Sequence, residues 1–169
     1  AMTTIVMGLL AGVYVSMAQE AERPTAARFS YPKIDGHGKV VRFVDAVDQP
    51  RPDSRLCVDV TAQGPAAKVH PAIEKAARFV NIYAGAGKRP ANVKITVVLH
   101  GGATQVALSS GAYRKLTGED ANPNVALLRS LKAEGVELLV CGQALTHKGF
   151  AADDVLGDIK VAVSALTAN

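Results

Sequence analysis

Residues 134–145, EGVELLVCGQAL, decide the fold. Gly135 predicts the end of a helix, because glycine readily adopts the left-handed conformation that follows a helix C-terminus. The apolar run at 136–140 predicts a short buried strand, and residues 143–147 predict a short helix just after it. A strand placed between two helices is typical of a parallel sheet. Cys141 therefore falls at the carboxyl end of a buried strand.

The same alternation of strands and helices continues along the chain. The sequence predicts further strands at 56–60, 93–99 and 159–163, and helices at 69–83, 103–113 and 122–135. Asn122 is the expected N-cap of the last helix, and Gly85 and Gly87 are expected to end the first. Since crossovers between parallel strands are right-handed, we expect an α/β fold, a three-layer sandwich with a mostly parallel sheet.

Three regions are expected. Residues 1–18 contain an uncharged apolar stretch that predicts a signal peptide and hence a periplasmic or exported protein, and the stretch is short for a stable membrane span. The alternative is a buried N-terminal helix or strand in a cytoplasmic protein. Residues 19–54 contain four of the eight prolines and predict an irregular arm with one short strand at 39–44. Residues 55–169 form the predicted α/β domain.

Composition sets further limits. The chain has 169 residues, of which 49% are hydrophobic and 20% charged, so one ordinary domain with a real core is expected. The net charge of +4 includes a basic stretch near the N-terminus that matches no nucleic-acid-binding motif, so we interpret it as a solvated segment and expect no nucleic-acid partner. No Cys or His pair has the spacing of metal ligands, so we expect no metal site.

Cys141 is the first candidate for chemistry. Its side chain is expected at the sheet edge, where open α/β sheets place their sites, and close to the N–H groups that open the next helix. These N–H groups, including those of Gly142 and Gln143, would favour the thiolate. The alternative is a small apolar residue that merely fills the end of a strand. Cys57 lies in the middle of a predicted strand, where a buried, unreactive thiol is the expectation, although a disulfide with Cys141 remains open.

His100 is the natural partner of this cysteine. It follows the predicted strand 93–99, whose carboxyl end is expected beside that of the Cys141 strand, and a histidine there could tune the thiol or carry a proton. The alternative is a loop histidine bonded to the backbone. Gly101 and Gly102 follow it and could form an anion-binding loop, although they match neither established phosphate-loop pattern.

Two segments, VVLHGG at 97–102 and NPNVALLRSLKAEGVELLVCGQAL at 122–145, resemble the DsrE/DsrF-like family, which includes the YchN-like proteins. The resemblance extends over residues 55–168. It implies a sulfur-relay protein that accepts sulfane sulfur on Cys141 as a persulfide and passes it to another protein. It also implies a homo-oligomer, a trimer or hexamer, with sulfur donor and acceptor proteins as partners and no organic cofactor.

The resulting hypothesis is a sulfur carrier of the cell envelope with Cys141 as nucleophile. His100 would tune the thiol, and Gly101, Gly102, Gly142 and Gln143 would hold the substrate or the developing anion. Two alternatives stay open: a non-catalytic oligomeric binding or assembly module with the same fold, and a small anion or nucleotide site at 100–102. The assembly module predicts that Cys141 is buried or in a disulfide.

Overall fold

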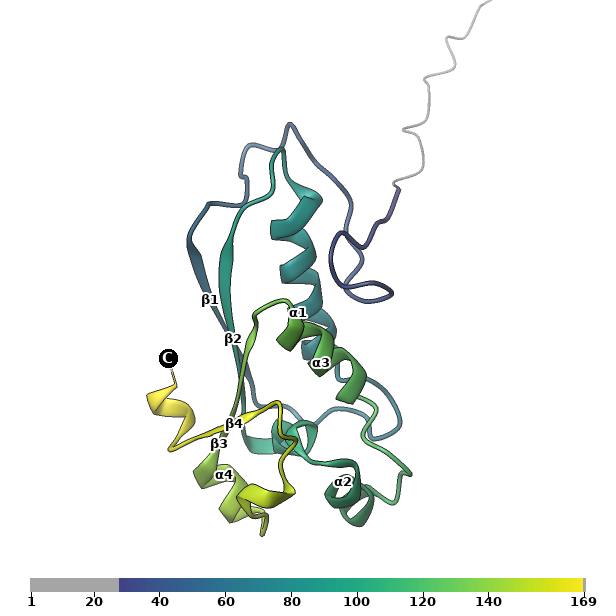
Figure 1. Cartoon of the computed structure of the whole chain (residues 1–169), viewed down its shortest axis with the longest axis vertical. Helices are drawn as coiled ribbons and strands as arrows, with labels where there is room; N and C mark the ends of the chain where they lie inside the picture. Colours follow the sequence, from purple (N-terminus) through teal and green to yellow (C-terminus); the bar gives the residue numbers. More distant parts are fainter. Residues whose placement is uncertain (1–27, 169) are drawn as a thin grey trace, which may run out of the picture.

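The computed structural model describes residues 28–168, so the predicted signal peptide lies outside the described part. Four strands form one parallel sheet in the order β1-β2-β3-β4. They are β1 (Ser54–Val60), β2 (Val93–Leu99), β3 (Glu137–Cys141) and β4 (Lys160–Ala162). The expected α/β sandwich with a parallel sheet is confirmed (Figure 1).

Helices connect and flank the strands. They are α1 (Pro71–Asn81), α2 (Ser110–Thr117), α3 (Val125–Ala133) and α4 (Gly142–His147), with 3₁₀ turns η2 (Gly101–Ala107), η3 (Ala152–Asp154) and η4 (Ala165–Thr167). A π-helical turn, η1 (Ile82–Ala86), extends α1 toward Gly87. The single helix expected at 103–113 is wrong: the chain instead forms η2, an isolated bridge at Leu108 and then α2, which Ser109 caps.

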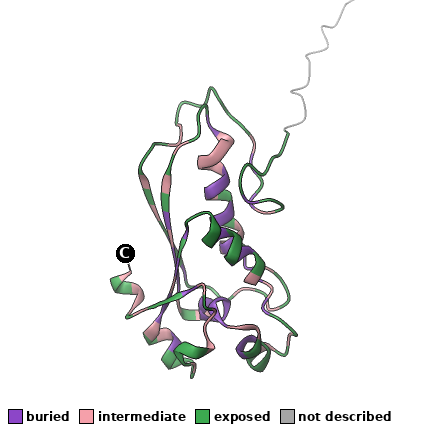
Figure 2. Ribbon diagram, viewed as in Figure 1, coloured by how far each residue is buried: buried purple, intermediate pink, exposed green. Residues whose placement is uncertain are grey.

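The core lies between the sheet and one layer of helices. Because the strands follow one another in sequence order, right-handed crossovers place the connecting helices on the same face, and α1 contacts α3 there. Val97 and Leu99 of β2 and Val140 of β3 are completely buried against this layer. Figure 2 shows the buried residues concentrated along the sheet and on the sides of α1 and α3 that face it.

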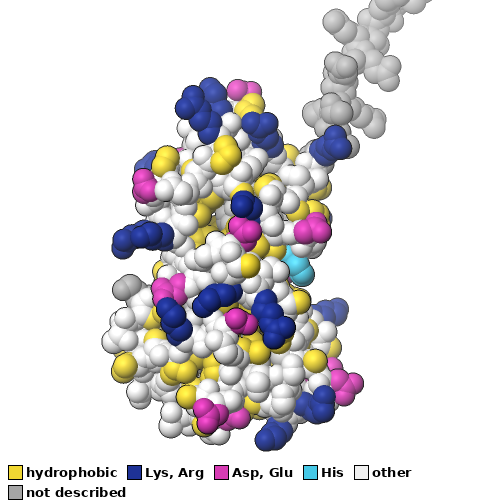
Figure 3. Space-filling view, viewed as in Figure 1, with side chains coloured by type: hydrophobic (Ala, Val, Ile, Leu, Met, Phe, Trp, Pro, Cys, Tyr) yellow, Lys and Arg dark blue, Asp and Glu magenta, His cyan; other side chains and the backbone are white. Residues whose placement is uncertain are grey.

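The opposite face of the sheet is open over β1. Arg55, Cys57 and Asp59 alternate along this strand and are all exposed. The prediction of a buried Cys57 is therefore wrong, because the edge strand β1 carries no helix on this face. On the side of the molecule shown in Figure 3, Lys and Arg side chains are interspersed with Asp and Glu side chains rather than forming one continuous basic patch.

Asn122 does not cap the following helix. Helix α3 begins at Val125, after Asn124. The Asn122 side chain is buried instead, where it donates to the carbonyls of Val106 and Leu108 and accepts from the Asn124 amide N–H. The expected N-cap is thus wrong by two residues, since the Asn122 side-chain oxygen accepts from Asn124, which precedes the helix, and not from an N–H group of α3. The expected glycine at the helix end is confirmed, because Gly135 has φ +82°.

The described part of the arm, from residue 28 on, folds back onto α1 (Figure 1). The expected strand at 39–44 is wrong, since only an isolated antiparallel bridge joins Val40 to Ser30. Ile34 is buried in the same core as the sheet. Asn81 at the end of α1 is fully buried, and its side chain accepts from the N–H groups of Lys33 and Ile34. Its amide nitrogen donates to arm carbonyls, including that of His37.

We expect Asn81→Ala to lower the free energy of unfolding by about 2–3 kcal/mol, because it leaves buried arm N–H groups without an acceptor. Urea denaturation measures the loss. The matched control is Asn92→Ala, which removes an exposed asparagine that contacts Asp53 and should cost less than about 1 kcal/mol. Equal losses in the two variants would show that Asn81 does not hold the arm.

Candidate functional site

Cys141 occupies the junction between a strand and a helix. It is the last residue of β3 and also the N-cap of α4, with φ −69° and ψ 117°. Its sulfur accepts a hydrogen bond from the Ala144 N–H at 3.4 Å, in the way that a serine hydroxyl caps other helices. No loop residue separates strand from helix, so the sulfur is held against N–H groups that have no partner inside α4.

Further donors surround the sulfur. Burial raises the pKa of the Cys141 thiol, but hydrogen bonds from the backbone N–H groups of Ala144, Ala165 and Gln143 lower it by more. The Ser164 hydroxyl also lowers it. The resulting pKa lies below the ordinary value of a cysteine thiol, so the thiolate is favoured although only 5% of the residue's surface is exposed.

Gly142 allows these donors to gather. A Cβ atom at this position would lie 2.9 Å from the carbonyl oxygen of Ala162, closer than such atoms approach. With glycine there, β4 passes directly over the start of α4, and the chain after β4 crosses Cys141. The Gln143 side chain fixes this crossing by donating to the Val163 carbonyl at 3.3 Å. Ser164 and Ala165 lie against the sulfur, and we call the segment that contains them, residues 163–167, the cover segment.

His100 lies one register position from Cys141. Leu99 pairs with Val140, so the next residues, His100 and Cys141, lie at the ends of neighbouring strands. The imidazole, however, turns toward β1, and its Nε2 atom contacts Asp59 Oδ1 at 2.7 Å. The polar groups that the structure places around the sulfur come from α4 and the cover segment instead.

Gly101 and Gly102 bring two loops together. A Cβ atom on Gly101, which has φ +55°, would lie 3.1 Å from the Thr61 carbonyl oxygen. A Cβ atom on Gly102 would lie 2.6 Å from the Gln63 backbone nitrogen. Both glycines thus permit close packing of the loop after β1.

The two cysteines carry thiols and lie on strands separated by β2. Cys57 pairs in register with Thr96, which pairs with Glu137, four residues before Cys141. Strand spacing then places the two Cα atoms about 16 Å apart, too far for a disulfide. The disulfide left open by the sequence is excluded in this fold.

The sequence did not point to Ser164 or Ala165. Both follow a strand of three residues, too short for a clear periodic pattern, and they reach Cys141 only because β4 pairs with β3. Within residues 28–168, no group of three or more His, Cys, Asp or Glu side chains could hold a metal ion. Nor does this part of the chain contain a helix long and apolar enough to cross a membrane.

Comparison with known proteins supports the assignment of the fold. The model of the DsrE/DsrF-like family matches residues 56–168. A solved structure, that of MTH1491 from Methanobacterium thermoautotrophicum, a protein of unknown function, superposes with a TM-score of 0.52. It is 18% identical, and the match covers 68% of this chain and 86% of that one, so it shows the fold alone. No curated protein matches the chain.

We expect Cys141 in a Cys57→Ser variant to react with iodoacetamide with a pH midpoint below that of the same cysteine in the urea-unfolded chain. The reason is that the folded protein lowers the thiol pKa. Ser164→Ala should move the midpoint upward, since it removes one donor, and Ser130→Ala, an exposed serine on α3, should not. A folded midpoint at or above the unfolded one would contradict this account of the site.

Proposed function

This chain belongs to the DsrE/DsrF-like family, and from that premise we propose that it is a sulfur carrier that holds sulfane sulfur on Cys141 as a persulfide. The family is associated with sulfur relay. The observation that carries the proposal is the capping position of Cys141, whose sulfur accepts the Ala144 N–H at 3.4 Å. Nearby donors on Gln143, Ser164 and Ala165 also help to lower the thiol pKa. A thiolate is the form that attacks a sulfur–sulfur bond.

The transfer proceeds in two exchanges. In the first, the Cys141 thiolate attacks the outer sulfur of a donor persulfide, R–S–SH. The new bond forms Cys141–S–SH, the donor S–S bond breaks, and its electron pair leaves with the donor as a thiolate. In the second, an acceptor thiolate attacks the outer sulfur on Cys141, and Cys141 leaves as the thiolate. Because this thiolate begins and ends the cycle, donors such as Ala144 N–H serve both exchanges.

The other predicted residues have roles within this proposal. Gly142 allows β4 to lie against the start of α4, and Gln143 supplies an N–H group to the sulfur. His100, oriented by Asp59, provides a proton-exchanging group at the same sheet edge. Gly101 and Gly102 allow the loop after β1 to pack closely at the carboxyl end of the sheet, where we propose that they help to hold the substrate. In this proposal only Cys141 forms a covalent bond.

Access to the sulfur requires the cover segment to move. Cys141 is 5% exposed, whereas Val163 is 75% and Leu166 88% exposed, so the cover segment buries little apolar surface of its own. The hydrogen bond that ties the start of the segment to α4 is the one from the Gln143 side chain to the Val163 carbonyl, and the donors of Ser164 and Ala165 lie against the sulfur. Segments with so few buried contacts open at small free-energy cost, and we propose that a partner protein meets Cys141 in this opened form.

The partners and location complete the proposal. A homo-oligomer, a trimer or hexamer, is proposed because β1 leaves one face of the sheet open. Sulfur donor and acceptor proteins would approach at the cover segment, beside the exposed Val161 and Val163. A location in the cell envelope is proposed from the uncharged stretch within residues 1–18, and N-terminal sequencing of the protein purified from its own cells tests it.

A second candidate function is an oligomeric assembly module without chemistry. The burial of Cys141 favours it, as do the exposed Val161, Val163 and Leu166 nearby, which would suit a permanent interface. The two functions differ in what happens to the thiol. A carrier must present Cys141 to small thiol reagents in the native state, whereas a permanent interface would keep it covered.

We expect a Cys57→Ser variant, incubated with a sulfane-sulfur donor such as polysulfide, to gain the mass of one sulfur atom on Cys141. Intact-mass spectrometry followed by peptide mapping measures the addition. Cys57→Ser/Cys141→Ser is the matched control and should gain nothing, because no thiol remains. The proposal fails if the first variant stays unmodified or if the control gains the same mass.

We expect Thr167→Ala to speed the alkylation of Cys141 several-fold, because the Thr167 hydroxyl ties the cover segment together by bonding to the backbone of Ser164. Thr117→Ala removes a comparable hydroxyl bond at the end of α2, to the Tyr113 carbonyl, and should leave the rate unchanged. Equal rates in Thr167→Ala and the parent protein would mean that the cover segment does not limit access.

A further inference from the structure

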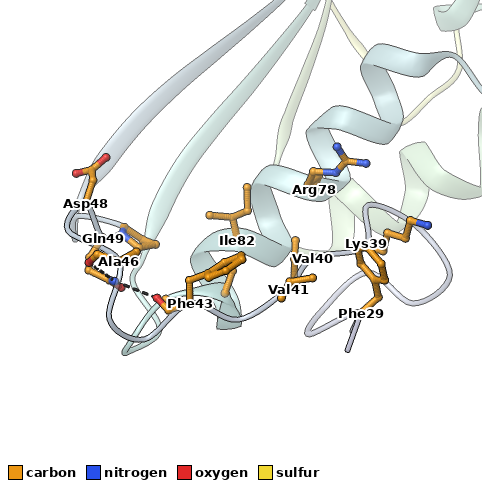
Figure 4. A pocket seen from close by; sticks show the side chains of 13 residues that line it. Phe29, Lys39, Val40, Val41, Phe43, Ala46, Asp48, Gln49, Arg78 and Ile82 are labelled. Atoms are coloured by element: carbon orange, nitrogen blue, oxygen red, sulfur yellow. Dashed lines mark hydrogen bonds between the residues drawn. The ribbon is translucent and has the colours of Figure 1, made fainter. Parts of the chain in front are cut away.

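A groove opens where the arm crosses the end of α1, away from Cys141. Its cavity has a volume of about 470 Å³. Figure 4 shows Phe43 and Ile82 together in the middle of the groove, with Phe29 and Lys39 at one end and Asp48 and Gln49 at the other. Ile82 follows the carboxyl end of α1, so the groove lies at the amino ends of the strands, whereas Cys141 lies at a carboxyl end. The arm also lies outside residues 56–168, the part matched by the family.

Hydrogen bonds hold the walls of this groove in place. The Phe43 N–H donates to the Ala86 carbonyl at 2.7 Å, which ties the arm to the π-helical turn. The Gln49 side chain accepts from the Lys88 N–H and donates to the Phe43 and Ala46 carbonyls. A Cβ atom on Gly87 would lie 2.7 Å from the Gln49 side chain. The Gln49 side chain can therefore pack against residue 87 only because that residue is glycine. A cavity with fixed walls loses little entropy when a ligand binds.

Much apolar surface in and around the groove is exposed. Phe29 is 56% and Phe43 64% exposed, and Tyr31, Val44 and Val47 on the same arm are exposed as well. Five of the nine exposed large hydrophobic side chains of the described residues thus lie on the arm, within 29–47. Aromatic walls and a volume of several hundred cubic ångströms are typical of sites for small organic ligands.

The charges in the groove indicate which ligand it suits. Arg78 of α1 and Lys39 of the arm both line it, and neither forms an ion pair with any residue of the described range. Lys39 Nζ instead lies 4.6 Å from the centre of the Phe29 ring. The single carboxylate in the lining, that of Asp48, lies 3.9 Å from Arg51. Two cations beside an apolar floor are complementary to a ligand with an apolar body and one anionic group.

We propose that this groove binds a small amphiphilic anion, a medium-chain or aromatic carboxylate, with its apolar body along Phe43 and Ile82 and its carboxylate at Arg78 and Lys39. The site is independent of sulfur transfer at Cys141, because it lies at the other end of the strands. The medium-chain carboxylate is proposed as a free solute. If the protein binds the anion only at a membrane surface and not in free solution, the proposal is contradicted.

The test uses the full chain and the fluorescent aromatic anion anilinonaphthalene sulfonate as the reporter, with decanoate as competitor below its micelle-forming concentration. The expected result is saturable binding with one reporter per chain and displacement by decanoate. Decanol, which has the same tail without the charge, should compete at least about fivefold less well. Arg78→Gln should weaken decanoate binding about fivefold or more and leave decanol unaffected.

Two control variants make the result decisive. Lys75→Gln removes an exposed cation one turn earlier on α1, outside the groove, and should bind decanoate like the parent. Phe43→Ser should weaken both decanoate and decanol, because it removes part of the apolar floor. Circular dichroism tests whether each variant is folded. If Arg78→Gln does not fold, Lys39→Gln replaces it as the variant that removes a positive charge from the groove.

The proposal would be overturned by reporter binding without saturation, by equal competition from decanol and decanoate, or by equal effects of Arg78→Gln and Lys75→Gln. Binding to anionic vesicles without binding to free decanoate would also overturn it. Absence of reporter binding would overturn it too, since it would mean that the groove does not accept an amphiphilic anion in the full chain.

Discussion

The structure depends on one constraint, the absence of any loop between β3 and α4. Cys141 must end the strand and cap the helix at the same time. Its sulfur is therefore placed where helix N–H groups have no internal acceptor. Gly142 completes the arrangement, because without a Cβ atom it lets β4 approach and carry Ser164 and Ala165 over the sulfur. The chemistry proposed for the chain follows from that junction.

The same donors have two opposite effects. They stabilise the thiolate, and in doing so they close the site, because Ser164 and Ala165 belong to the segment that covers Cys141. A carrier must be reactive when a partner arrives and protected otherwise, since exposed thiolates oxidise readily. A cover with exposed Val163 and Leu166 side chains can satisfy both demands, because its opening loses few apolar contacts.

Long, strongly patterned elements could be predicted from the sequence, and so could the place of Cys141 at a strand end. The continuous apolar run of β2 and the glycine after α3 are local signals that tertiary structure did not override. Asn122 and Cys57 were misjudged because their surroundings come from distant segments: the Asn122 side chain is buried against the carbonyls of Val106 and Leu108, and no helix covers the outer face of β1. Ser164 was missed for the same reason, since only strand pairing brings it to the sulfur.

The most direct test of the central claim is cyanolysis of the isolated protein after it has been loaded with sulfane sulfur and separated from the donor, since cyanide removes only transferable sulfur, as thiocyanate. The account predicts a stoichiometric yield from the Cys57→Ser protein, and a yield that falls to background when Cys141 is also replaced by Ser. Background yield from the first protein, or equal yields from both, would contradict the claim that Cys141 carries sulfur.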